Sequence, residues 1–71
     1  MKQILIVEDD ELLNKMLVYN LQSESYGIVS VETVKEAMEV LKSQQFDLVL
    51  LDINLPDGNG YVIAKTIREK Y

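Results

Sequence analysis

The chain has 71 residues, carries a formal net charge of −5 and contains neither cysteine nor histidine. Disulfides, cysteine-based metal sites and any histidine base, nucleophile or ligand are therefore excluded. The length allows one small domain at most, and the negative charge argues against nucleic-acid binding through this segment while it suits a cation site. No signal peptide or membrane span is predicted, because no apolar run is long enough.

The first predicted elements are a strand and a helix. An apolar, β-branched run at residues 4–7 predicts a short buried strand, which ends at four consecutive acids. A helix is expected next, with Asp10 as its N-cap and Gly27 as the residue that ends it. Its apolar stripe, with Met16 in the core, is expected at Leu12, Leu13, Met16, Leu17, Asn20 and Leu21.

A second strand and a second helix follow. Residues 28–32 alternate between apolar and polar as far as Val31, which predicts a strand near an edge of the sheet. Thr33 and Glu36 have the spacing of a capping box, so the helix is expected to begin there. Its apolar face is expected to consist of Val34, Ala37, Met38 and Leu41.

The stretch from Phe46 to Gly60 is the one around which the other elements are arranged. Residues 48–51 form an apolar run that predicts a strand buried on both faces, and Asp52 stands where that run ends. A loop with the only proline and two of the three glycines follows, and residues 61–71 predict a third helix.

The alternation of strands and helices predicts an α/β fold with a parallel sheet and right-handed crossovers. The first and third strands are the most apolar, so they are expected side by side, which gives the strand order 2-1-3. In open parallel sheets, ligands bind at the carboxyl ends of the strands where the strand order reverses. That point lies here between the first and third strands.

Acids follow both of these neighbouring strands, with Glu8, Asp9 and Asp10 after the first and Asp52 after the third. Carboxylates brought this close repel one another, which raises a pKa or requires a cation. With no nitrogen or sulfur ligands, the fitting cation is Mg²⁺ or Mn²⁺. An aspartate can also act as a nucleophile that forms an aspartyl phosphate, and a metal ion beside it neutralises the charge of the incoming phosphoryl group.

Two segments with this separation resemble the receiver domain of two-component response regulators: ILIVEDD at 4–10 and FDLVLLDINLPDGNGY at 46–61. The whole chain is similar to the first part of a flavodoxin-like receiver fold, in particular to receivers attached to winged-helix transcription factors. The resemblance implies that Asp52 is the phosphoacceptor. It also implies Mg²⁺ ligation by Asp9, Asp52 and the backbone carbonyl of Asn54, with Glu8 contributing through water.

The same resemblance implies a cytoplasmic signalling module rather than an enzyme, which a sensor histidine kinase phosphorylates. Pro56 and Gly60 match the loop that shapes the phosphorylation site. Receivers also have a fourth strand ending in Ser or Thr and a fifth ending in Lys, and no position of this sequence matches either one. Residues 1–71 are therefore expected to be the β-α-β-α-β-α portion of a single incomplete domain, impaired in switching, with a DNA-binding output domain in the full-length protein.

Two other functions stay open at this point. Asp52-Ile53-Asn54 is superficially similar to the Asp-x-Asp motif of haloacid dehalogenase-type phosphohydrolases, which also form an aspartyl phosphate. In those enzymes, however, the nucleophile follows the first strand. The other alternative is an assembly module in which the acidic site is a relic.

A homodimer is also expected. The third strand, at 48–51, has no predicted neighbour on its far side, and an unpaired strand edge is a template for another chain. Apolar side chains at Leu48, Leu50, Ile63 and Ile67 would be exposed there. Two copies are therefore expected to meet at their third strands or through the adjacent apolar faces.

Overall fold

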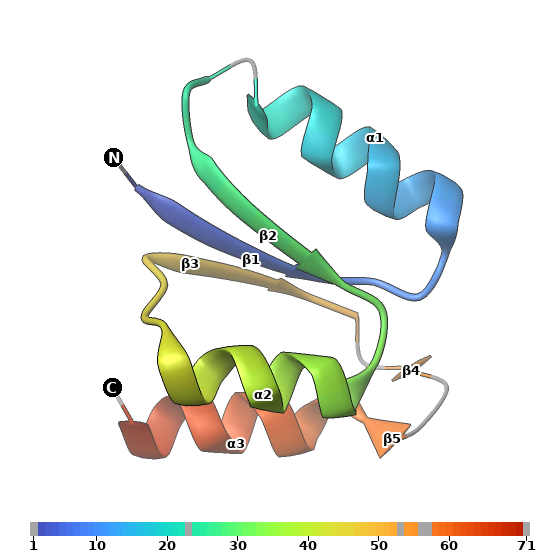
Figure 1. The fold of residues 1–71 in the computed structure, drawn as a ribbon. Coiled ribbons are helices and arrows are strands. Elements are labelled where there is room, and N and C mark those ends of the chain that lie inside the picture. Colours follow the sequence, from blue (N-terminus) through green and yellow to red (C-terminus); the bar gives the residue numbers. More distant parts are fainter. Residues whose placement is uncertain (1, 23, 53, 56–57, 71) are drawn as a thin grey trace.

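The structure is a computed structural model that describes residues 2–22, 24–52, 54–55 and 58–70. The main elements follow the predicted order (Figure 1): β1 Gln3–Val7, α1 Glu11–Gln22, β2 Gly27–Val31, α2 Val34–Ser43, β3 Leu48–Leu51 and α3 Gly60–Lys70. The segment after Asp52, expected to be a loop, contains two additional two-residue strands. These strands, β4 Asn54–Leu55 and β5 Gly58–Asn59, pair antiparallel.

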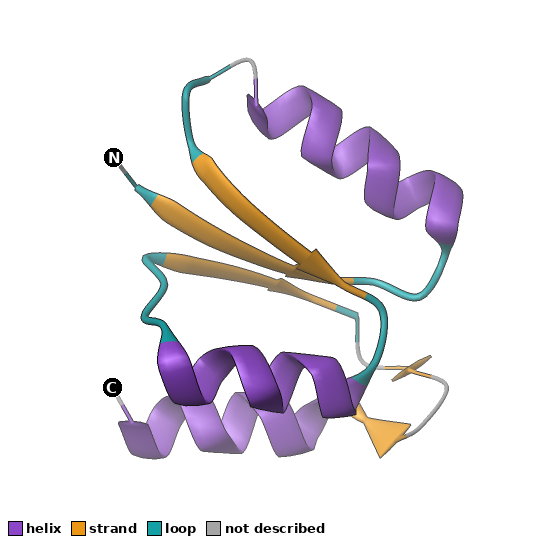
Figure 2. Ribbon diagram, in the orientation of Figure 1, coloured by secondary structure: helices purple, strands orange, loops and turns teal. Residues whose placement is uncertain are grey.

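The three longer strands form a parallel sheet in the order β2-β1-β3. Ile4 of β1 is paired with Ile28 on one side and Leu48 on the other, and Val7 is paired with Val31 and Leu51. The helix α1 covers one face of the sheet, and α2 and α3 lie together on the other (Figure 2). The predicted fold class, with its strand order 2-1-3 and three helices, is confirmed.

The core lies between the sheet and the pair α2 and α3. Buried residues from four elements, β1, β2, α2 and α3, form one cluster there: Leu5, Val7, Val31, Ala37, Leu41 and Ile63. β1 lies at its centre, and the exposed fraction of each residue from Ile4 to Val7 is 2% or less. Full burial of such side chains contributes about 1.5–3 kcal/mol each, so β1 is the strand that stabilises this small fold most.

α2 begins and packs as its sequence predicts. Thr33 is the N-cap, and its hydroxyl oxygen accepts a hydrogen bond from the Glu36 backbone N–H at 3.1 Å. The Glu36 carboxylate returns toward the cap and accepts a hydrogen bond from the Thr33 hydroxyl at 3.1 Å. Ala37 and Leu41 are buried, and Val34 and Met38 pack against the same cluster.

α1 is rotated relative to the predicted stripe. Met16, expected in the core, is 53% exposed and Leu12 is 69% exposed, whereas Asn14 is 6% exposed. The face toward the sheet consists instead of Asn14, Leu17, Val18 and Leu21, which also have i, i+3, i+4, i+7 spacing. Because α1 carries more apolar residues than one face holds, its periodicity admits two orientations. The orientation that the structure adopts places the polar Asn14 in the buried face, which the apolar pattern did not predict.

The predicted end of the first helix is also wrong. α1 ends at Gln22, and the left-handed residue after it is Ser25, with φ of 63°. Gly27 instead begins β2, where its N–H donates a hydrogen bond to the Lys2 carbonyl at 2.8 Å. An added Cβ on Gly27 would come within 2.5 Å of the Gln3 side-chain amide nitrogen, so a larger residue there would require the flexible end of the Gln3 side chain to move.

β3 is less buried than expected. Leu48 is 48% exposed, and Val49, Leu50 and Leu51 are each partly buried. Of the four side chains expected to be exposed beside this strand, only Leu48 is; Ile63 is fully buried against α2 and the sheet, and Leu50 and Ile67 are partly buried. The strand is at the edge of the three-stranded sheet, with β1 on one side, so the second flank that complete burial would need is open among the described residues. No helix in the described ranges is long and apolar enough to cross a membrane.

Candidate functional site

Acidic side chains gather where β1 and β3 end. The Asp52 backbone N–H donates a hydrogen bond to the Val7 carbonyl at 2.9 Å, so the pairing of β1 with β3 continues as far as the acids. Glu8, Asp9 and Asp52 each offer a carboxylate oxygen, and these oxygens all lie within 4.8 Å of one another. Glu8 and Asp52 are partly buried, and Asp9 is exposed. The strand order alone therefore brings residues 44 positions apart into one cluster.

The electrostatics of the cluster act against full ionisation. Burial raises the pKa of the Glu8 carboxyl above its ordinary value of 4.5, and the neighbouring Asp52 raises it further through a hydrogen bond and charge repulsion. A hydrogen bond from the Asp10 backbone N–H to Glu8 Oε2, at 3.2 Å, acts in the opposite direction but does not cancel the rise. A cation between these carboxylates would remove the repulsion.

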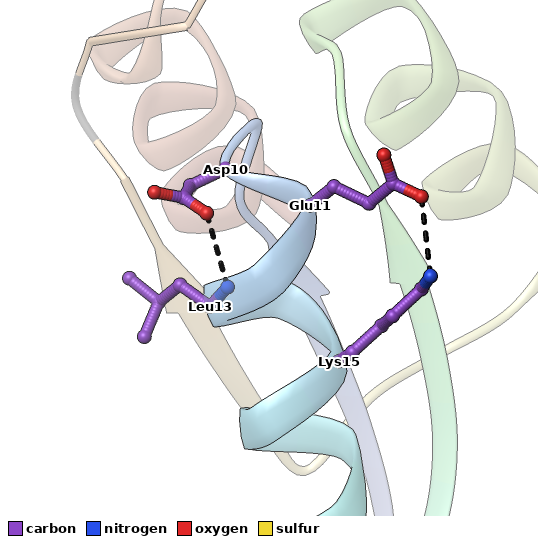
Figure 3. A network of polar contacts seen from close by, with 4 residues as sticks. All are labelled: Asp10, Glu11, Leu13 and Lys15. Carbon is purple, nitrogen blue, oxygen red and sulfur yellow. Dashed lines mark hydrogen bonds and ion pairs between the residues drawn. The ribbon is translucent and has the colours of Figure 1, made fainter.

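Asp10 and Glu11 serve the helix rather than the cluster (Figure 3). Asp10 Oδ1 accepts a hydrogen bond from the Leu13 backbone N–H at 3.1 Å, which makes Asp10 the N-cap of α1 as predicted. Glu11 forms an ion pair with Lys15 at 3.2 Å, one helical turn later. The run of four acids thus divides into two residues at the strand end and two at the helix start.

The donor set fits a hard divalent cation. All three side chains offer oxygen, and Mg²⁺ is bound in proteins through one or two carboxylates together with water and phosphate oxygens. A cavity of about 310 Å³ adjoins the cluster, lined by Glu8 and Asp52 together with apolar side chains of β1, β3 and α1. The cluster therefore combines ligands for a metal ion with an adjoining cavity that two of its carboxylates line.

Asn54, whose backbone carbonyl is the fourth predicted ligand, lies in β4, two residues after Asp52. Pro56 lies outside the described residues, and Gly60 is the buried first residue of α3. Asn14 was missed by the sequence reasoning, although its side chain contacts the acidic segment directly. Its Nδ2 donates hydrogen bonds to the Glu8 carbonyl at 2.9 Å and to the Val31 carbonyl at 3.2 Å.

Comparison with protein families gives one match, to the response regulator receiver domain, over residues 4–71. Among curated proteins, the cell cycle response regulator CtrA of Brucella ovis is 33% identical over 66 residues. That alignment covers 93% of this chain but 28% of the relative. The chain therefore spans less than a third of the length of this relative.

Solved structures give the same result. The non-phosphorylated HemR receiver domain from Leptospira biflexa superposes with a TM-score of 0.92 at 41% identity, over 99% of this chain and 56% of that one. TrrA from Thermotoga maritima, in complex with Mg²⁺ and BeF, has a TM-score of 0.90 at 40% identity, over 99% and 61%. TrrA bound to the histidine kinase ThkA gives 0.89 at 39% identity, over 100% and 61%.

Proposed function

The chain belongs to the response regulator receiver family of two-component systems, and we propose that Asp52 is its phosphoacceptor. The observation that supports this role best is the position of Asp52 at the end of β3, with its carboxylate beside those of Glu8 and Asp9. Receiver domains are signalling modules, and the family match does not favour the phosphohydrolase alternative. In the proposal, residues 1–71 are the β-α-β-α-β-α portion of a receiver domain.

Phosphorylation would proceed by nucleophilic attack of an Asp52 carboxylate oxygen on phosphorus. The new O–P bond forms as the bond from phosphorus to the donor's histidine nitrogen breaks, and the electron pair of that bond returns to the imidazole. The pairing of Asp52 with Val7 fixes the backbone of the nucleophile at the sheet edge. The cavity lined by Leu17, Leu50 and Asp52 adjoins this nucleophile.

Asp9, Asp52 and the backbone carbonyl of Asn54 are the proposed ligands of Mg²⁺ or Mn²⁺, with Glu8 contributing through water. When bound, the cation supplies positive charge against which the phosphoryl oxygens are stabilised. Asp9 is the most exposed of the three acids, so its carboxylate is accessible to a cation from solvent. Glu8 would keep its partly buried charge because the cation offsets the repulsion from Asp52.

The partners in this proposal are a sensor histidine kinase and a second copy of the chain. TrrA, to which this chain is similar, was solved with the histidine kinase ThkA. A cytoplasmic location and a winged-helix DNA-binding output domain in the full-length protein belong to the same proposal. The second copy is expected at β3, where Leu48 is 48% exposed at the edge of the sheet.

A pair of substitutions with the same change of charge tests the metal site. Asp9→Asn should weaken Mn²⁺ binding, measured by titration calorimetry, because it removes one of the clustered carboxylates. Asp10→Asn should leave the affinity at the wild-type value, since Asp10 is the helix N-cap and asparagine also caps helices well. Equal affinities for the two variants would contradict the assignment of Asp9.

Labelling with acetyl phosphate in the presence of Mg²⁺, followed by intact-mass spectrometry, tests the phosphoacceptor. Wild type and Asp10→Asn are expected to gain one phosphoryl group only slowly, because no residue of this chain matches the hydroxyl and lysine that help to hold the phosphoryl group in receivers, and Asp52→Asn is expected to gain none. Labelling of Asp52→Asn at the wild-type rate would show that another residue accepts the phosphoryl group. Wild-type protein that binds the metal but is never labelled would favour the alternative in which the site is a relic.

A further inference from the structure

Asn14 is the one buried polar side chain outside the acidic cluster among the described residues. It lies in the second turn of α1 and is 6% exposed. Burial of an amide is unfavourable unless its hydrogen bonds are made, and Asn14 makes two, to the carbonyls of Glu8 and Val31. The carboxyl ends of β1 and β2 are thereby joined to α1.

These hydrogen bonds fix the backbone of Glu8 on both sides. Its N–H donates to the Val31 carbonyl at 3.1 Å, and its carbonyl accepts from Asn14 Nδ2 at 2.9 Å. The Val31 carbonyl accepts from both Glu8 and Asn14, so the three residues form one connected unit. The side chain of Glu8 leaves this unit toward Asp52.

Asn14 also holds the other end of the acidic segment. Its backbone N–H donates a hydrogen bond to the Asp10 carbonyl at 2.8 Å, which closes the first turn of α1. The side chain therefore binds residue 8 while the backbone binds residue 10. Asp9, the residue between them, is held by contacts on both of its neighbours.

We propose that Asn14 is the positioning residue of the acidic site, which holds Glu8 and Asp9 where their carboxylates meet that of Asp52. This inference rests on the proposed function, since it assumes that the cluster binds a divalent cation. Asn14 would touch neither the cation nor the phosphoryl group. It acts through the backbone of the segment that carries two of the acids.

The consequence for metal affinity follows from preorganisation. Without the Asn14 amide, the Glu8 carbonyl loses its partner and residues 8–10 gain conformations in which the carboxylates do not converge. Loss of a residue that orients metal ligands typically lowers metal affinity by about 10–100-fold. Asn14→Leu, which keeps the size of the side chain but has no donor, is therefore expected to weaken Mn²⁺ binding by about tenfold.

The experiment compares Mn²⁺ affinity, by electron paramagnetic resonance of the free ion, under conditions where circular dichroism shows every variant to be folded. Two controls separate positioning from stability. Met38→Ala removes packing from α2, on the far side of the sheet, and Asn20→Leu makes the same exchange at an exposed position of α1. Both are expected to keep the wild-type affinity, and Asn14→Leu alone to lose it.

A second readout needs no metal. The amide resonances of Glu8, Asp9 and Asp10 should shift in Asn14→Leu and stay unchanged in Met38→Ala. If Asn14→Leu does not fold, Asn14→Ser, with a smaller polar group, should still bind Mn²⁺ more weakly than Met38→Ala does. Wild-type affinity in a folded Asn14 variant would overturn the positioning role alone. Absence of Mn²⁺ binding by the wild type would overturn the metal site itself and this inference with it.

Discussion

Glu8 is a residue whose ionisation is opposed both by burial and by a neighbouring carboxylate. Its carboxyl is partly buried beside Asp52, and both effects raise its pKa above 4.5. The folded state consequently binds the Glu8 proton more tightly than the unfolded chain does. This carboxyl contributes stability while it is protonated, and the contribution is lost as the pH rises through its pKa in the folded state.

Glu8→Gln should therefore raise the thermal unfolding midpoint of the metal-free protein at neutral pH, because it removes a charge that the fold disfavours. The difference from wild type should shrink as the pH falls toward 4.5, where the wild-type Glu8 also takes up its proton. Calorimetric scans at several pH values, in the presence of a chelator, measure this difference.

Glu11→Gln is the matched control, since Glu11 is exposed and pairs with Lys15 on the surface of α1. It should not raise the midpoint. An equal rise in both variants would mean that the net charge of the chain, and not the environment of Glu8, sets the effect. Addition of Mg²⁺ should stabilise wild type more than Glu8→Gln, because the cation removes the same repulsion.

At the level of residues, the sequence predicted the acids of the site but not their support. Glu8, Asp9 and Asp52 follow from two apolar runs that stop at carboxylates. The role of Asn14 could not be predicted in this way, because an asparagine on a helix is ordinarily exposed to solvent. Its burial depends on hydrogen bonds to the Glu8 and Val31 carbonyls, whose positions are known only from the structure. A buried polar residue that donates hydrogen bonds to backbone carbonyls does not contribute to the apolar periodicity from which helix faces are predicted.

Some helices and strands could be predicted from the sequence and others could not. β1 and α2 were predictable because each has one consistent pattern: a continuous apolar run in β1, and a capping box followed by a single apolar face in α2. α1 was not, since its surplus of apolar residues leaves its orientation open. The pair β4 and β5 has two residues in each strand, which is too short for any alternation to appear.

The capping box stabilises the start of α2. Thr33→Ala should lower the free energy of unfolding by about 1 kcal/mol, because the Glu36 backbone N–H loses its acceptor. Thr33→Ser keeps a hydroxyl oxygen at the cap and should retain most of that stability. Urea unfolding followed by circular dichroism measures both variants. Equal losses for serine and alanine would assign the effect to the threonine methyl group instead.

For the whole molecule, the strand order follows from composition, since the two most apolar strands became neighbours and β2 lies at an edge. Composition does not predict how far β3 is buried, because its burial depends on what covers the open edge of the strand. A groove of about 640 Å³ lies between β3 and α3, lined mainly by Phe46, Val49, Leu51, Ala64 and Ile67. Apolar surface of this kind on so small a fold favours association.

The proposed homodimer would form at the open edge of β3. Leu48 is 48% exposed on β3, so a charge there should disturb the fold little but should oppose pairing of two such strands. Sedimentation equilibrium at micromolar concentration should show a dimer for wild type and a monomer for Leu48→Glu. Leu12→Glu, the same exchange at a 69% exposed position of α1, should remain dimeric. A folded wild-type monomer would rule out the dimer, and dissociation of Leu12→Glu alone would place the interface on α1 instead.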